Sequence, residues 1–316
     1  MKAPRESRTA GPDEAPGNPF IEDDDSSENR SDTRLALLAR DGDAAALESL
    51  VQKHHDWIYN LSLRFMLNPV DAGDLAQEAL IKIVTRIGGF EGRSAFRTWA
   101  YRIVANTFLD ARRGRLENAI TNFTDYGREL DQVPLQNLSV AGASEPERHV
   151  LIEEAKLGCM LGMLLCLDRE QRLTYLIGEI MEAPSQVGGE ILGITAAAFR
   201  KRLERARRDL SAFMNDKCGL INTNNPCRCE KKTAGFIKAG WVDPANIKFT
   251  GSHLQKLRRQ SGAKAAGFDR LYQNDYAPLF REHPFYRRPD LVERIQATLA
   301  APETERVFRL GPEENR

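Results

Sequence analysis

Apolar side chains recur at steps of three and four residues between residues 33 and 115, which is the period of amphipathic helices. After a first turn at Asp41-Gly42-Asp43, turn signals divide the rest of the pattern into three runs. Asp43 and Asn68 each stand directly before a run, where a short polar side chain caps a helix, and Pro69 suits a first helical position. Gly88 follows the second run and ends it. The pattern predicts a small bundle of helices in this part of the chain.

The second of these helices has an apolar stripe on one side and a polar stripe on the other. The polar stripe consists of Asp74, Gln77, Glu78, Lys82 and Thr85. Such a face either lies in solvent or docks on a partner. Both interpretations stay open from the pattern alone.

The third helix is strongly basic. Between Gly92 and Arg115 the sequence has six arginines and one acidic residue, together with Trp99 and Tyr101. Arginine neutralises phosphate, and aromatic rings stack on unpaired bases. At helical steps, one outer face consists of Arg102, Asn106, Asp110 and Arg113. This composition favours binding to nucleic acid.

Helical periodicity is lost over residues 116–147. A structureless stretch of this length is unusual inside a compact domain. The segment is therefore predicted to be a linker, and a second helical unit follows over residues 148–215.

The second unit contains the pattern of a helix-turn-helix motif. Gly193 supplies a tight turn, and Thr195 is suited to cap the next helix. Its predicted inward face consists of Phe199, Leu203, Ala206 and Leu210. Its predicted outward face consists of Arg200, Lys201, Arg202, Arg205, Arg207 and Arg208. A solvated basic helix is the alternative, but the turn together with the crowded positive charge favours binding in a DNA groove.

Net charge separates the chain into regions, although lysine plus arginine and aspartate plus glutamate balance at 45 each. Residues 1–32 lack periodicity and end in acidic residues, which is typical of a disordered acidic tail. The start of the chain has no apolar signal segment, and no apolar run approaches the roughly 18 residues that span a bilayer. We therefore expect a cytoplasmic protein without membrane insertion, in which thiols stay reduced.

Residues 216–316 form a C-terminal extension with three clustered cysteines, Cys218, Cys227 and Cys229. Arg228, Lys231 and Lys232 lie close by in the sequence, and their charge is expected to favour the thiolate form. Thiolates select zinc or copper(I) over magnesium or calcium. His253 is the candidate fourth ligand. A metal site, a redox switch and a plain loop all stay open.

The chain resembles the extracytoplasmic-function (ECF) sigma factors of bacteria. The stretches GDAAALESLV, DAGDLAQEALIKI, FEGRSAFRTW and YRIVANTFLDARR resemble sigma region two, within residues 33–115. The stretch EILGITAAAFRKRLERARRDL resembles sigma region four, within residues 148–215. The resemblance implies a mostly all-α fold of two small helical domains joined by a linker, and a role in transcription initiation.

The resemblance also implies partners and site residues. Bacterial core RNA polymerase would be bound by Asp71, Asp74, Gln77 and Glu78. The minus-ten promoter element would be melted and bound by Arg93, Arg97, Trp99, Arg102, Asn106 and Arg113. The minus-thirty-five element would be bound by Thr195, Arg200, Lys201, Arg202, Arg205 and Arg208. An anti-sigma factor is a further candidate partner. No catalytic residue and no required cofactor is implied, so the chain is not expected to be an enzyme.

Two other functions remain as alternatives. A freestanding helix-turn-helix regulator would explain the second unit and leave the first without a role. A metal or redox sensor would explain only the C-terminal cysteines. One departure from the family pattern stands before the turn, where Val187-Gly188-Gly189 replaces the usual Glu-Ile-Ala. Glycine within a helix costs roughly 1 kcal/mol relative to alanine, so this helix is expected to be short or mobile.

Overall fold

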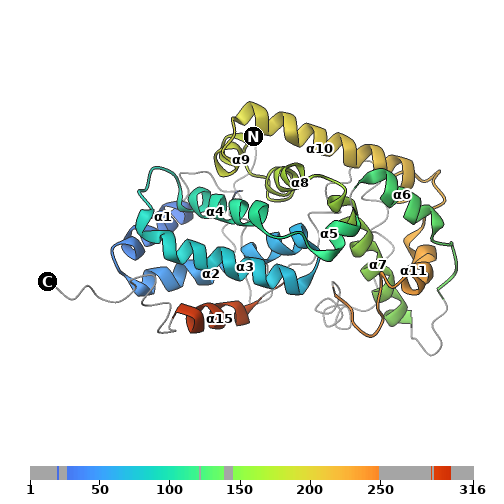
Figure 1. Cartoon of the computed structure of the whole chain (residues 1–316), viewed down its shortest axis with the longest axis horizontal. Coiled ribbons are helices and arrows are strands. Elements are labelled where there is room, and N and C mark those ends of the chain that lie inside the picture. The colour runs from blue at the N-terminus through green and yellow to red at the C-terminus, as the bar shows by residue number, and fades with distance from the viewer. Residues whose placement is uncertain are drawn as a thin grey trace, which may run out of the picture.

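The structure is a computed structural model of the chain, and it describes residues 20, 27–120, 122–138, 145–248, 286 and 288–299. Every regular element in these ranges is helical, which confirms the predicted mostly all-α fold (Figure 1). The α-helices are α1 (Ser27–Arg40), α2 (Ala44–Met66), α3 (Pro69–Arg86), α4 (Phe96–Asp110), α5 (Arg115–Ala119), α6 (Phe123–Gln132), α7 (Glu145–Leu165), α8 (Arg169–Tyr175), α9 (Ser185–Leu192), α10 (Ala196–Lys217), α11 (Cys229–Lys238) and α15 (Pro289–Leu299). A 3-10 turn, η1 (Ile87–Gly89), follows α3, and a π-helical turn, η2 (Leu176–Ile180), follows α8.

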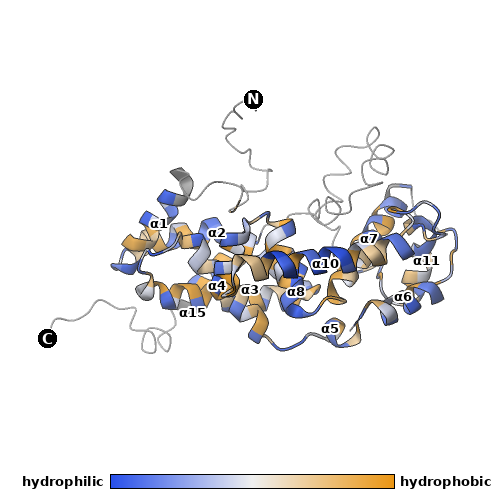
Figure 2. Cartoon of the chain, turned by 90° about the horizontal axis from the view of Figure 1, so that it is seen from above, coloured by the Kyte–Doolittle hydropathy of each residue, from blue (hydrophilic) through white to orange (hydrophobic). Residues whose placement is uncertain are grey.

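The first helical unit is a bundle of α1 to α4, in which α2 packs against both α1 and α3. The predicted caps are confirmed: the Asp43 side chain accepts from Ala46 N at 3.0 Å, and the Asn68 side chain accepts from Val70 N at 2.9 Å. Each helix carries hydrophilic and hydrophobic residues, as Figure 2 shows. Among the described helices, none is both long enough and apolar enough to cross a membrane.

The prediction that residues 1–32 form a disordered tail is wrong for its last part, because α1 begins at Ser27. Asp32 is 4% exposed. Its carboxylate accepts a hydrogen bond from Lys53 Nζ at 2.8 Å and lies 3.2 Å from His54 Nε2. An acidic residue that pairs with Lys53 and His54 becomes part of the bundle instead of solvating a tail.

The second helical unit contains α7, α8, α9 and α10. The helix α10 packs against both α8 and α9. The predicted inward face of α10 is confirmed, since Phe199, Leu203, Ala206 and Leu210 are all buried.

The prediction of a structureless linker over residues 116–147 is wrong, because α5 and α6 lie within it. The α6 residue Tyr126 is buried, and its ring centroid lies 5.9 Å from that of Phe213 in α10 and 6.1 Å from that of Trp241 in the extension. Lys232 of α11 donates to the carbonyl oxygens of Leu130 and Val133. The segment carries a short amphipathic signal, with Phe123, Tyr126, Leu130 and Val133 at steps of three and four residues, which the sequence interpretation missed. It folds against later parts of the chain.

A buried ion cluster joins the two helical units at α5. Glu117 is 5% exposed and accepts hydrogen bonds from Arg169 at 2.6 and 2.7 Å and from Arg172 at 3.2 Å. Arg172 also donates to Phe65 O of α2 at 2.9 Å, and Arg169 donates to Phe108 O of α4 at 3.3 Å. Arg169 and Arg172 of α8 therefore bind the ends of α2 and α4 directly, and they bind α5 through Glu117.

Candidate nucleic-acid interface and docking surfaces

The turn between α9 and α10 has the geometry that the sequence predicts. Gly193 has a φ of +66°, in the left-handed region where glycine carries no steric penalty. Thr195 caps α10, because its hydroxyl oxygen accepts from Ala198 N at 3.1 Å. The two helices therefore meet at a tight, capped turn, as a helix-turn-helix motif requires.

The helix α9 is short, as expected, with 8 residues, and its two glycines have a packing role. A Cβ atom at Gly188 would lie 2.4 Å from ring atoms of Phe199, and a Cβ at Gly189 would lie 2.8 Å from Ile194 O. Only glycine allows α9 to approach α10 and the turn this closely. The helix α9 extends over Ser185–Leu192, and the propensity cost of its glycines is offset by the packing that they permit.

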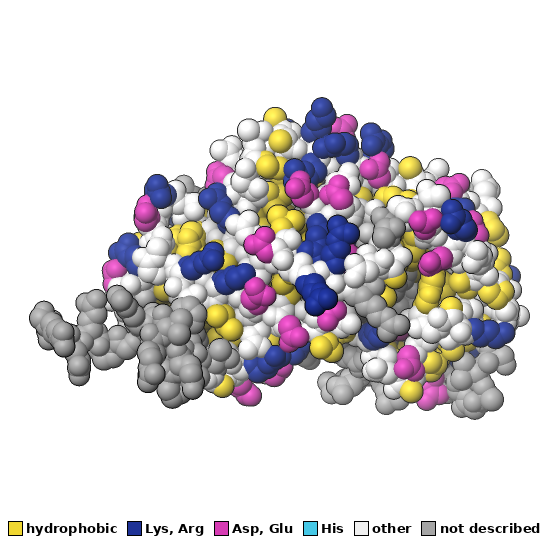
Figure 3. Space-filling view, viewed as in Figure 1, with side chains coloured by type: hydrophobic (Ala, Val, Ile, Leu, Met, Phe, Trp, Pro, Cys, Tyr) yellow, Lys and Arg dark blue, Asp and Glu magenta, His cyan; other side chains and the backbone are white. Residues whose placement is uncertain are grey.

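The outer face of α10 is basic and exposed for most of its length. Arg200, Lys201, Arg205 and Arg208 are exposed. Arg202 is half-buried, and its guanidinium lies 2.8 Å from the Glu170 carboxylate. Figure 3 shows Lys and Arg side chains gathered over α10, with acidic side chains among them. Four of the five predicted basic contacts of this helix are thus available, and Arg202 is engaged within the protein.

The helix α4 and its flanks present only some of the predicted DNA-binding residues. Arg102, Asn106 and Arg113 are exposed. Arg93 is also exposed, and its Nε lies 2.6 Å from the Glu91 carboxylate. Trp99 is half-buried, with its ring centroid 5.5 Å from that of Phe90.

The assignment of Arg97 to DNA is wrong for this structure. Its side chain is buried at 5% exposure, and the guanidinium lies 5.6 Å from the centroid of the Phe20 ring. Adjacent helical positions point in different directions, so the burial of Arg97 does not follow from that of Phe96 and comes from its own contact with Phe20. Arg97 therefore packs within the first unit.

The helix α4 of the first unit meets α9 of the second unit, which sequence reasoning missed. Arg102 donates two hydrogen bonds to Glu190 O, at 2.9 Å from Nε and 2.6 Å from Nη2. Part of the predicted minus-ten surface therefore contacts the first helix of the helix-turn-helix motif. The sequence carries no signal for it, because the two residues are 88 positions apart.

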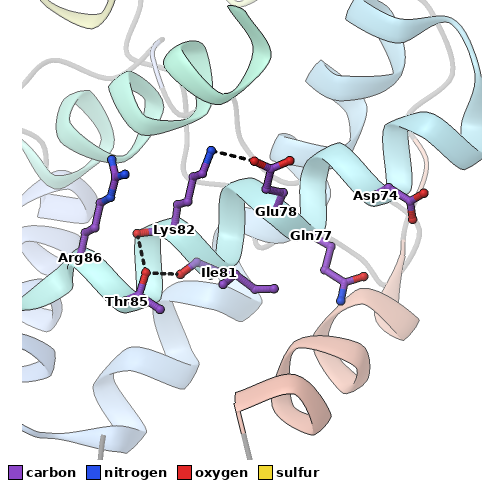
Figure 4. Close-up of a pocket in the computed structure, with 7 residues that line it drawn as sticks. All are labelled: Asp74, Gln77, Glu78, Ile81, Lys82, Thr85 and Arg86. Atoms are coloured by element: carbon purple, nitrogen blue, oxygen red, sulfur yellow. Dashed lines mark hydrogen bonds and ion pairs between the residues drawn. The ribbon is translucent and has the colours of Figure 1, made fainter. Parts of the chain in front are cut away.

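The polar stripe of α3 lines a shallow groove of about 600 Å³. Its lining residues are Asp74, Gln77, Glu78, Ile81, Lys82, Thr85 and Arg86 (Figure 4). Lys82 Nζ lies 2.7 Å from the Glu78 carboxylate, one helical turn away. Asp74 and Glu78 are exposed, whereas Asp71 and Gln77 are half-buried. Three of the four residues predicted to bind polymerase thus line one groove.

The cysteines of the extension lie in a folded region that also includes a cysteine of α7. The Asn225 side chain donates to Cys218 O at 3.3 Å and closes the loop that follows Cys218. The helix α11, which comes after this loop, packs against α7. Cys159 of α7 lies near Cys229. The charges of Cys159, Cys218 and Cys227 all raise the pKa of Cys229. The spacing of Cys218, Cys227 and Cys229 does not reveal this fourth cysteine, because it lies in an earlier helix.

The expectation of reactive thiolates is wrong. Burial raises the pKa of Cys218 and Cys227, and it raises that of Cys229 well above the ordinary value. Arg228 lowers the pKa of Cys218 and Cys227, but by less than burial raises it. Its guanidinium is engaged by Thr223 O at 2.9 Å and Cys227 O at 2.8 Å. The three cysteines are half-buried, and this burial outweighs the nearby positive charge.

Among the residues that the structure describes, no group of three or more His, Cys, Asp or Glu side chains is placed to hold a metal ion. The candidate fourth ligand, His253, lies outside the described residues. Zinc has thiolate ligands at about 2.3 Å. Metal binding by Cys218, Cys227 and Cys229 would therefore require their side chains to move together.

Comparisons with known proteins agree on one family. The family model described as Sigma-70 region 2 matches residues 50–116. The chain is 29% identical over 175 residues to the ECF RNA polymerase sigma factor SigW of Bacillus subtilis, which covers 55% of this chain and 92% of SigW. It is 31% identical over 186 residues to the RNA polymerase sigma factor NccH of Alcaligenes xylosoxydans xylosoxydans, which covers 58% of this chain and 94% of NccH.

A solved structure is also similar. It is described as the structure of CnrH in complex with the cytosolic domain of CnrY, and it shares 21% sequence identity with this chain at a TM-score of 0.42. The match covers 59% of this chain and 98% of the solved chain.

Proposed function

The chain belongs to the extracytoplasmic-function (ECF) family of bacterial RNA polymerase sigma factors, and from this premise we propose how its surfaces serve that function. A sigma factor binds core RNA polymerase and directs it to promoters for transcription initiation. One observation supports the assignment of roles. A polar groove and two exposed basic surfaces lie on separate helices of the same chain. Residues 33–115 and 148–215 act as sigma regions two and four.

We assign the groove of α3 to core RNA polymerase. Asp74, Gln77 and Glu78 line it, and Asp71 lies in the first turn of the same helix. The exposed carboxylates of Asp74 and Glu78 attract a basic partner surface, and a shallow groove accepts a partner helix. Ile81 supplies an apolar contact within the groove.

We assign the two basic surfaces to promoter DNA. Arg102, Asn106 and Arg113 would contact the minus-ten element. Trp99 is half-buried beside them, and a base would stack on it once its neighbours shift. Thr195, Arg200, Lys201, Arg205 and Arg208 would contact the minus-thirty-five element. The chain needs no bond chemistry for this role, since melting is driven by the binding of unstacked bases and phosphates.

Run-off transcription with purified core RNA polymerase tests the proposed function. We expect transcripts from a specific set of promoters only when the protein is added. If the protein instead binds an operator tightly without polymerase, and no transcript depends on it, a freestanding helix-turn-helix regulator is the correct interpretation. An anti-sigma partner remains a prediction, which capture of a specific inhibitor of this transcription would test.

The variant Arg205→Ala is expected to weaken binding of the polymerase complex to duplex promoter DNA. Loss of one phosphate contact should reduce the slope of log affinity against log salt concentration by about 1. The measurement is closed-complex affinity over a salt series. Arg128→Ala is the matched control, because Arg128 is also exposed but lies on α6 beside Asp125. An unchanged slope for Arg205→Ala would remove α10 from the DNA interface.

We further propose that Cys218, Cys227 and Cys229 bind a soft metal ion, zinc or copper(I), after their thiols lose protons. Because the folded protein raises their pKa values, metal binding must displace protons and should strengthen as the pH rises. The measurement is zinc content after purification under reducing conditions, at pH 6.5 and 8.5. We expect Cys227→Ser to bind less zinc than wild type. The control is Cys166→Ser, which changes a buried cysteine directly after α7 that is outside the proposed ligand set, and it should bind as much zinc as wild type. Metal-free wild type at both pH values would contradict the proposal and leave a structural loop.

A further inference from the structure

The described end of the C-terminal extension is a helix, α15, that docks on the first helical unit. It packs against α2 and α3, and Figure 1 places it along their outer side. Leu291 is 0% exposed and Ile295 is 1% exposed. These residues are four positions apart, so they form one apolar face that is covered by the bundle. The helix is therefore an integral part of the packing in this structure.

The residues before α15 are fixed to α2 by specific polar contacts. The Asn60 side chain donates to Tyr286 O at 2.7 Å and accepts from Tyr286 N at 2.9 Å. Arg288 N donates to the Asp56 carboxylate at 2.7 Å, and its guanidinium lies 4.5 Å from the centroid of the Tyr59 ring. Asn60, Asp56 and Tyr59 are all buried. Buried polar groups need partners, and here the C-terminal extension supplies them.

The helix α15 also reaches the face of α3 that we assign to polymerase. Arg294 Nη2 lies 3.4 Å from Asp74 Oδ1. Gly73, next to Asp74, is so close to the extension that a Cβ there would lie 3.6 Å from Arg288 Nη1. Figure 4 shows α15 beside this end of the groove, with the Gln77 side chain pointing towards it. The extension thus occupies one end of the docking face and engages one of its carboxylates.

We propose that α15, together with Tyr286 and Arg288, is an intramolecular ligand of the α3 docking face and competes there with core RNA polymerase. The inference rests on the proposed role of Asp74 and its neighbours. A basic residue on an amphipathic helix is the kind of partner that this acidic face accepts. Because the helix is tethered, its effective concentration is high. The affinity for polymerase is lowered by the fraction of molecules in which α15 is docked.

The full-length variant Ile295→Asp tests the proposal, since a carboxylate at a fully covered position releases the helix. We expect it to bind core RNA polymerase at least about tenfold more tightly than wild type, because the docked fraction falls. Ala297→Asp is the matched control, since it adds the same charge at an exposed position of the same helix. Arg288→Ala is a second, milder variant that removes the contacts with Tyr59 and Asp290. Circular dichroism reports whether each variant is folded.

If wild type binds core RNA polymerase and both variants fold but bind it no more tightly than wild type, α15 does not compete with the polymerase. Weaker binding would mean that α15 belongs to the polymerase interface. If neither wild type nor any variant binds core RNA polymerase, the proposed function itself fails, and this inference fails with it. Tighter binding by Ile295→Asp and Arg288→Ala, with Ala297→Asp unchanged, supports it.

Discussion

Replacing Glu117 with alanine is expected to lower the free energy of unfolding by about 3 to 5 kcal/mol, which is typical for breaking a buried ion pair by removal of one partner. Glu117 is 5% exposed and accepts hydrogen bonds from both Arg169 and Arg172. Its loss would leave two guanidinium groups without a counter-charge, and Arg172 is only 1% exposed. Chemical denaturation monitored by circular dichroism is the measurement.

The same cluster predicts a pH dependence. Burial raises the pKa of Glu117, but the hydrogen bond from Arg169 and the charges of Arg172, Arg169 and Arg113 outweigh it, so the pKa lies below its ordinary value of 4.5. The pair therefore contributes stability above pH 4.5, and the contribution is lost as the pH falls through the folded pKa. The stability difference between wild type and Glu117→Gln should shrink over that range.

The exposed residue Glu129 on α6 gives the matched control, and Glu129→Ala is expected to change stability by less than about 0.5 kcal/mol. A loss of under 1 kcal/mol for Glu117→Ala would show that the cluster is not what joins the two helical units. Arg169 and Arg172 link α5 to the ends of α2 and α4. The variant should therefore also loosen the contact between α4 and α9, which is measurable as faster amide exchange in both helices.

Replacing Phe199 with alanine is expected to cost about 3 to 5 kcal/mol and to abolish binding to the minus-thirty-five element. Phe199 is 0% exposed, and its ring fills the space between two glycines. Added Cβ atoms would lie 2.4 Å from this ring at Gly188 and 3.0 Å from it at Gly178. The ring therefore sets the distance between α9 and α10. It thereby also sets the position of the basic face of α10 relative to α9.

A double-mutant cycle separates this fit from general loss of a core residue. Gly188→Ala alone should cost about 1 to 3 kcal/mol, because the added methyl group overlaps the ring. In the background of Phe199→Ala that penalty should vanish, since the ring is gone, so the two changes are not additive. Additive costs in denaturation would refute the close packing of α9 on α10. Gly88→Ala serves as the control, because a Cβ there has nothing within 4 Å.

Local features of the fold could be predicted from the sequence. The caps at Asp43, Asn68 and Thr195 and the glycine turn at Gly193 stand where they were predicted. These features depend on residues a few positions apart, so the pattern along the chain contains them. The same holds for the buried face of α10 and for the polar stripe of α3, which follow from the helical period.

Only the tertiary structure decided which polar residues are available. Arg97 and Glu117 are buried, and Arg102 contacts Glu190. The pKa of the Cys229 thiol is raised, although basic residues lie near it in the sequence. The sequence also did not show where α5 and α6 pack, or that α15 packs on the docking face. In each case the deciding partner is distant in sequence. Periodicity reports which side of a helix is apolar, but burial and pairing depend on which other helix covers it.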